Sequence, residues 1–160
     1  MDIIRIFNEK IIEKNITWTV KGLIDENNTV FSLGSDSKLI GRIFELITYG
    51  VLKDIADENG YILEPSDSQT VYPDYTFVKK SDNSKIAVDI KTTYRQRYIK
   101  NGLVKPFVYC LGAFGSYIRN NTKNIKYPFD QYSEHYVVCF FYDRNPNAQE
   151  GLELSLEDID

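Results

Sequence analysis

Two carboxylates and one ammonium group flank a short predicted hairpin in the stretch VYPDYTFVKKSDNSKIAVDIK, residues 71–91. With the turn at SDNS, Asp74 faces position 89 or 90 across the hairpin. Because side chains alternate along a strand, Asp89 and Lys91 share one face, while Ile90 points the other way into the core. The pattern therefore predicts that Asp74, Asp89 and Lys91 converge on one small volume.

Such a group suits metal-assisted hydrolysis of a phosphodiester. Two neighbouring carboxylates repel, which raises a pKa unless a cation lies between them. Oxygen ligands with no His or Cys nearby suit Mg²⁺, which also binds substrate phosphate. Lys91 can then orient the attacking water and stabilise charge on the phosphate oxygens. The same spacing also fits a surface hairpin with an ion pair between Asp89 and Lys91, and the pattern alone does not favour the functional interpretation.

The net charge of −4 argues against a nucleic-acid partner until the charges are mapped. Residues 91–126 contain eight Lys or Arg and no Asp or Glu, whereas residues 130–160 contain eight acids and one base. A basic run is often only a solvated surface. Directly after a carboxylate hairpin, it equally suits a polyanion whose phosphates need neutralising.

Length and composition favour one domain, 1–160, of ordinary globular character, with 42% hydrophobic and 26% charged residues. No stretch approaches the ~18 apolar residues of a membrane span. The N-terminus MDIIRIFNEK lacks the features of a secretory signal. Cys110 and Cys139 are too few for a disulfide framework, so we expect a reducing, bacterial-type cytoplasm and two buried thiols.

Hydrophobic periodicity predicts the elements that position these residues. In chain order they are a helix at 2–14, a hairpin at 16–33 with its turn near 26–28, a helix from an N-cap at Ser35 or Asp36 to about Glu58, the strand YILEP, strands at 75–79 and 85–91, a helix in PFVYCLGAFGSYIRN, and a buried central strand in HYVVCFFYD. This order predicts an α/β (α+β) fold in which helices flank one mixed central β-sheet.

Individual side chains in these elements carry further expectations. The buried stripe of the long helix should contain Leu39, Ile43, Phe44, Leu46, Ile47, Val51, Ile55 and Ala56. Glu45 stands next to this stripe, and it either leaves the helix at a solvated edge or has a functional role. His135 is expected to be structural, and Trp18 to lie in the core or at an interface.

Three blocks of the sequence resemble the EcoRV-type type II restriction endonucleases of the PD-(D/E)xK nuclease superfamily. The blocks are GSDSKLIGRIFEL (34–46), VYPDYTFVKK with IAVDIKTTY (71–94), and YIRNNTKNIKYPFDQY (117–132). The resemblance implies a restriction-endonuclease-like core and a Mg²⁺-dependent enzyme, with Mn²⁺ as a substitute. It also implies a homodimer that cuts double-stranded DNA at a short palindromic site and leaves 5'-phosphate ends.

The resemblance also implies residue roles. Asp74 and Asp89 would bind the metal, Lys91 would be the catalytic lysine, and Glu45 would be a further acid that can serve a metal. Positions expected close to the DNA are Asp36, Lys38, Gln69, Thr92, Thr93, Ser116, Asn121 and Lys123. Thr70 departs from the family pattern, which has Asn there, and the hairpin at 17–32 corresponds to part of the dimer interface.

Members of this family are longer than 160 residues, and we expect this chain to lack the C-terminal part that reads bases in the major groove. The chain alone is then expected to bind DNA weakly, with a steep salt dependence and little sequence preference. Two alternatives to a restriction endonuclease stay open. One is a repair or structure-selective nuclease with the same core, and the other is a non-catalytic DNA-binding or dimerising remnant.

Overall fold

A computed structural model describes residues 1–34, 36–95, 115, 119–121, 123–143, 147 and 149–156 of the chain. The elements are helix α1 (Ile3–Glu13), strands β1 (Gly22–Ile24) and β2 (Val30–Leu33), helix α2 (Ser37–Glu58), strands β3 (Tyr61–Pro65), β4 (Tyr75–Lys79) and β5 (Lys85–Tyr94), the 3₁₀ helix η1 (Phe129–Gln131), and strands β6 (Tyr132–Tyr142) and β7 (Glu150–Leu154). None of the helices in these ranges is long and apolar enough to cross a membrane.

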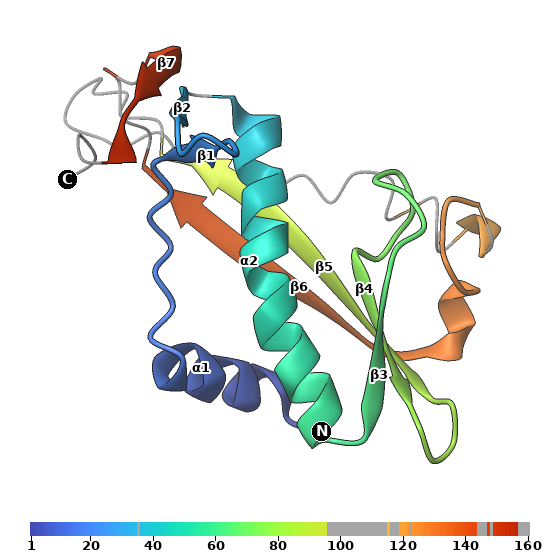
Figure 1. The fold of residues 1–160 in the computed structure, drawn as a ribbon. Helices are drawn as coiled ribbons and strands as arrows, with labels where there is room; N and C mark the ends of the chain where they lie inside the picture. Colours follow the sequence, from blue (N-terminus) through green and yellow to red (C-terminus); the bar gives the residue numbers. More distant parts are fainter. Residues whose placement is uncertain are drawn as a thin grey trace, which may run out of the picture.

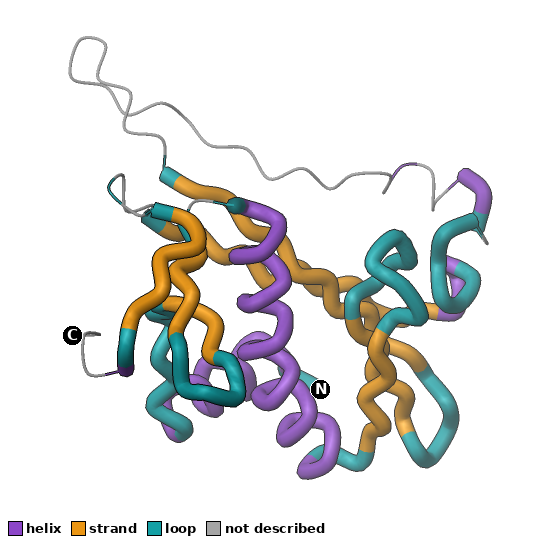
Figure 2. The backbone as a smooth tube through the Cα atoms, turned by 45° about the horizontal axis from the view of Figure 1, so that its top comes forward, coloured by secondary structure: helices purple, strands orange, loops and turns teal. Residues whose placement is uncertain are grey.

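The strands form two sheets, whereas the sequence predicted one. In the four-stranded sheet β3-β4-β5-β6, the first three strands are antiparallel and β6 is parallel to β5, which makes the sheet mixed. Strands β1, β2 and β7 form a separate antiparallel sheet. This small sheet lies near the N-terminal end of α2, on the side away from β3 and β4 (Figure 1 and Figure 2). The α+β class with a mixed sheet is confirmed.

Helix α2 lies across one face of the four-stranded sheet (Figure 1) and begins where the sequence predicted. The Asp36 carboxylate caps it by accepting hydrogen bonds from the backbone N–H groups of Lys38 (2.7 Å) and Leu39 (3.1 Å). Its buried residues are Phe44, Thr48, Val51, Leu52, Ile55 and Ala56. The prediction for Leu46 was wrong, since this side chain is 56% exposed because it faces a pocket rather than the sheet.

Strand β6 exists as predicted, but not as a buried central strand. It lies at the edge of the described sheet, paired with β5 on one side. Tyr136, Val138 and Phe140 pack against the core, while the alternate residues Val137 and Phe141 are 41% and 37% exposed. Cys139 shares this outer face and is exposed, which corrects the expectation of a buried thiol. Cys110 and nearly all of the helix predicted around it lie outside the described residues.

Candidate active site

The β4–β5 hairpin brings Asp74, Asp89 and Lys91 together. Tyr75 pairs with Val88, so the register places Asp74 opposite Asp89, within the range that the turn predicted. Lys91 forms an ion pair with Asp89, and its Nζ atom also donates to the carbonyl oxygen of Ile90 at 3.3 Å. The side chain of Ile90 lies in the hydrophobic core. Alternation along β5 therefore directs the two charged side chains to one face, as the sequence predicted.

Backbone contacts fix Asp74 at the entrance to β4. The Ile90 N–H donates to Asp74 Oδ2 at 2.6 Å, which ties the carboxylate to the neighbouring strand. The preceding loop is held by a parallel bridge between Tyr72 and Ile125. In this bridge Tyr72 N–H donates to the Asn124 carbonyl at 3.0 Å, and Lys126 N–H donates to the Tyr72 carbonyl at 2.8 Å. The position of Asp74 thus depends on a segment about fifty residues further along the chain.

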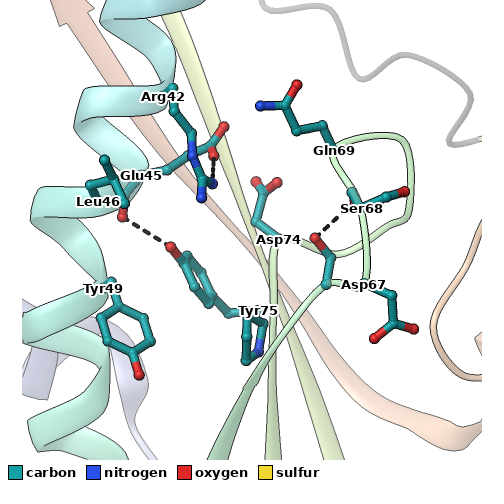
Figure 3. A pocket seen from close by; sticks show the side chains of 11 residues that line it. Arg42, Glu45, Leu46, Tyr49, Asp67, Ser68, Gln69, Asp74 and Tyr75 are labelled. Atoms are coloured by element: carbon teal, nitrogen blue, oxygen red, sulfur yellow. Dashed lines mark hydrogen bonds and ion pairs between the residues drawn. The ribbon is translucent and has the colours of Figure 1, made fainter.

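A pocket of about 400 Å³ opens beside Asp74. Three segments line it: Arg42, Glu45, Leu46 and Tyr49 from α2, residues 65–69 from the end of β3 and the loop that follows it, and Asp74 with Tyr75. Arg42 and Glu45 project from the helix toward Asp74, and Gln69 faces them from the loop (Figure 3). The Tyr75 hydroxyl donates to the carbonyl oxygen of Glu45 at 3.0 Å, which joins helix and strand in the lining of the pocket. The structure thus brings Glu45 and Gln69 to the same pocket as Asp74.

The carboxyl of Asp74 lies in an unfavourable environment for a negative charge. Burial is the main cause that raises its pKa to about 7, and the charge of Asp89 adds to this effect. Glu45 acts in the same direction more weakly, while the Ile90 N–H and Lys91 oppose the shift. Asp89 is itself only 6% exposed. The mutual repulsion of the two carboxylates that the sequence predicted is therefore present, although burial is the larger cause.

The donor set fits a hard divalent cation. Asp74 and Asp89 offer oxygen atoms only, and a cation between them would relieve the repulsion that raises the pKa of Asp74. Within the described ranges, no group of three or more His, Cys, Asp or Glu side chains is arranged to hold a metal ion. Two carboxylates completed by water and substrate oxygens are the usual arrangement for Mg²⁺, so this is compatible with the predicted cofactor.

Glu45 does not complete a third ligand position in this structure. Its side chain is 22% exposed, and its Oε2 atom accepts from Arg42 Nη1 at 2.6 Å. The solvated-edge alternative is therefore only partly correct, because Glu45 is half-buried, ion-paired and directed at the pocket. Arg42 was not predicted as part of the site, although a cation three residues before an acid on a helix is a recognisable signal for an ion pair.

The residues expected near DNA are spread over several segments. Lys38 and Lys123 are exposed, as is Gln69 at the pocket. Thr92 and Thr93 follow Lys91 on β5, and a Cβ added at Gly41 would lie 3.2 Å from Thr92 Oγ1, so α2 passes close to the strand there.

Two of the remaining positions have structural partners. Asp36 caps α2, and Asn121 Oδ1 accepts from the Asp130 N–H at 3.2 Å. Ser116 lies outside the described residues.

The ring of His135 stacks on Phe129 at 4.3 Å, and its Nδ1 atom lies 2.7 Å from the Tyr72 hydroxyl, which agrees with a structural role.

Comparisons with known proteins found a family model and a relative that each match most of the chain. The family model described as "Restriction endonuclease EcoRV" matches residues 14–160. The chain is also similar to the type II restriction enzyme EcoRV of Escherichia coli, with 41% identity over 144 residues. That alignment covers 89% of this chain and 57% of the relative, so the chain spans little more than half the relative's length.

Proposed function

The chain belongs to the restriction endonuclease EcoRV family, and on this premise we propose that it hydrolyses phosphodiester bonds in double-stranded DNA as a type II restriction endonuclease. The observation that carries the proposal is the meeting of Asp74, Asp89 and Lys91 at one end of the β4–β5 hairpin, beside an open pocket. Hydrolysis would depend on Mg²⁺, with Mn²⁺ as a substitute, and would leave 5'-phosphate ends.

Each residue then has a defined task. Asp74 and Asp89 would hold the cation, with Glu45 as a further acid that can serve it. When bound, Mg²⁺ supplies positive charge that favours ionisation of water and neutralises the phosphate. Lys91 reaches Asp89 from the same face of β5, where its ammonium group would orient the attacking water and stabilise charge on the phosphate oxygens. The Ile90 N–H keeps the Asp74 carboxylate oriented throughout.

A homodimer on a short palindromic site is part of the same proposal. Two-fold symmetry of a protein matches two-fold symmetry of its DNA site. The β1–β2 hairpin supports this state, because it exposes apolar side chains on both faces of β1: Leu23 is 47% and Ile24 is 56% exposed. A second copy of the chain packed on this hairpin would remove part of this apolar surface from water.

Cleavage of supercoiled plasmid by the 160-residue chain tests the proposal. We expect nicked or linear products with Mg²⁺ or Mn²⁺, none with EDTA, and loss of cleavage in Asp74→Ala, Asp89→Ala and Lys91→Ala variants. Asp82→Ala is the matched control, because Asp82 lies exposed in the turn of the same hairpin. An Asp89→Ala variant that cuts at nearly the wild-type rate would refute the assignment of the site.

The nature of the cut is tested on the products. Fragment ends that ligate directly have a 5'-phosphate, and sequencing of the ends shows whether the cuts share one palindrome. Sedimentation in the presence of a duplex oligonucleotide gives the oligomeric state. Cuts at DNA junctions or lesions instead would favour a repair nuclease, and binding without any cleavage would favour a non-catalytic remnant.

A further inference from the structure

Arg42 has no role in the mechanism above, yet it lines the pocket beside Asp74. It comes from α2 one turn before Glu45, on the exposed side of the helix that also carries Leu46. Its guanidinium group lies against the Glu45 carboxylate and on the side of Asp74 (Figure 3). Glu45 is the main cause that raises the pKa of Arg42, and the charge of Asp74 also contributes to the increase.

The charges around the pocket make this position unusual. Among the described residues that line the pocket, Glu45, Asp67 and Asp74 are acidic and Arg42 is the single cation. Asp67 is paired with Lys126, at 3.0 Å, on the far side of the loop. A DNA phosphate that approaches Asp74 therefore meets carboxylates, and Arg42 is the group in this lining that attracts it.

The ion pair between Arg42 and Glu45 can be exchanged for another. The Arg42 side chain is 48% exposed, so an ion pair at this position contributes little to stability and opens easily. A guanidinium group carries five N–H donors in a planar fork that matches a phosphate as well as a carboxylate. Arg42 Nη1 donates to Glu45 Oε2 at 2.6 Å, which leaves other N–H donors of the guanidinium group for an incoming phosphate.

We propose that Arg42 is a phosphate-binding residue of this site and that, in the absence of DNA, it occupies Glu45 and keeps this carboxylate from the cation. The inference rests on the proposed function, since it takes DNA as the source of the phosphate. Transfer of Arg42 to a phosphate frees Glu45 beside Asp74, which adds negative charge where the cation binds. DNA and the divalent cation therefore strengthen each other's binding, and by linkage the effect is reciprocal.

Removing Arg42 has two opposite consequences, which distinguishes this role from a merely structural one. In Arg42→Ala, Glu45 is free from the start, so the DNA-free protein binds Mn²⁺ about twofold to fivefold more tightly, the equivalent of losing a half-exposed ion pair. The same variant binds duplex DNA in EDTA on the order of tenfold more weakly, because a charged hydrogen bond to the phosphate is removed. The slope of log affinity against log salt becomes shallower by about 0.9 for each phosphate that Arg42 no longer neutralises.

Titration calorimetry with Mn²⁺ and fluorescence anisotropy with a labelled duplex oligonucleotide measure both quantities without any cleavage. Arg5→Ala is the matched control, since Arg5 also pairs with an acid on its own helix, Glu9 at 2.7 Å, but on α1. Arg42→Lys keeps the charge without the planar fork and should retain part of the DNA affinity. Thermal unfolding followed by circular dichroism checks that the variants stay folded, and Arg42→Gln replaces Arg42→Ala if the latter does not.

Two results would overturn the inference. Unchanged DNA affinity and salt slope in Arg42→Ala would show that Arg42 does not bind phosphate. Unchanged or weaker Mn²⁺ binding would show that Arg42 does not compete with the cation for Glu45. Plasmid cleavage by the wild-type chain is scored separately. If it fails while both binding shifts appear, the proposed catalysis is wrong and the role of Arg42 stands.

Discussion

Replacing Asp74 with asparagine is expected to stabilise the metal-free protein at alkaline pH and to give no such gain in acid. Burial and the charge of Asp89 raise the pKa of Asp74 from 3.8 to about 7 in the folded state. Below 3.8 the carboxyl is protonated in both the folded and the unfolded chain, so it causes no difference. Between the two values only the unfolded chain releases the proton, and the free energy of unfolding falls as the pH rises. At pH values above about 7, the folded chain has also released the proton, and the free energy of unfolding falls no further.

The size of the effect follows from the difference between the two pKa values. A difference of about 3 corresponds to about 4 kcal/mol of lost stability above the folded-state value. Asparagine removes this charge and keeps an oxygen that can accept from the Ile90 N–H. In the wild-type chain the Ile90 nitrogen lies 2.6 Å from Asp74 Oδ2. Burial of the amide group costs part of the gain. We therefore expect Asp74→Asn to be more stable than the wild type by about 2 kcal/mol at about pH 8.

Urea unfolding in EDTA, at about pH 4 and about pH 8, measures this difference for the variant and the wild type. Asp130→Asn serves as the control, because Asp130 is an exposed carboxylate in η1. Saturation with Ca²⁺, at ~100 times its Kd, should add about 2.7 kcal/mol to the wild type and much less to Asp74→Asn. A gain of equal size at both pH values, or a wild type that is more stable than the variant at alkaline pH, would refute the electrostatic reasoning.

Three further outcomes are expected. Ca²⁺ should support DNA binding more than cleavage, and full cleavage after exhaustive chelation would exclude a metal role for Asp74 and Asp89. Lys126→Met removes the two hydrogen bonds that Lys126 Nζ donates to the Pro65 carbonyl and to Asp67, both at 3.0 Å. This variant should stay folded and bind DNA more weakly. Unchanged binding would show that the segment 65–69 does not need these hydrogen bonds to bind DNA. DNA affinity of the 160-residue chain should fall steeply with salt and vary little with sequence, and discrete fragments from one palindrome would contradict this expectation.

The parts of the fold that local sequence determines were predicted well. The turn SDNS and the alternation on both sides of it were enough to place Asp74 opposite position 89 or 90, and the observed register selects Asp89. The capping signal at Ser35 or Asp36 marked the start of α2, and Asp36 is the residue that caps it. Both signals act over a few residues, so no knowledge of distant contacts was needed.

Long-range pairing limited the rest of the prediction. Strand β7 pairs with β2, and the Ser32 hydroxyl accepts from the Leu152 N–H at 3.0 Å, across more than one hundred residues of chain. Its sequence EGLEL has only a weak strand pattern, so it was not predicted. The prediction that β6 is a buried central strand was wrong for the opposite reason, a strand pattern that was too strong. Its apolar residues occur on both faces, which is typical of a central strand, yet one face is partly exposed at Val137 and Phe141.

The site combines a rigid frame with a destabilised charge. Ile90 anchors β5 in the core, and its N–H holds Asp74 next to Asp89, so the two carboxylates cannot separate to reduce their repulsion. A buried carboxyl whose pKa is raised to about 7 lowers the stability of the metal-free fold at alkaline pH. The same arrangement keeps the two carboxylates in place in the free protein, so less ordering would be required for the proposed cation to bind. The electrostatic destabilisation of the free protein would therefore be the consequence of the preorganisation of the proposed cation site, and a divalent ion that offsets it should bind more tightly at pH values above the pKa of Asp74.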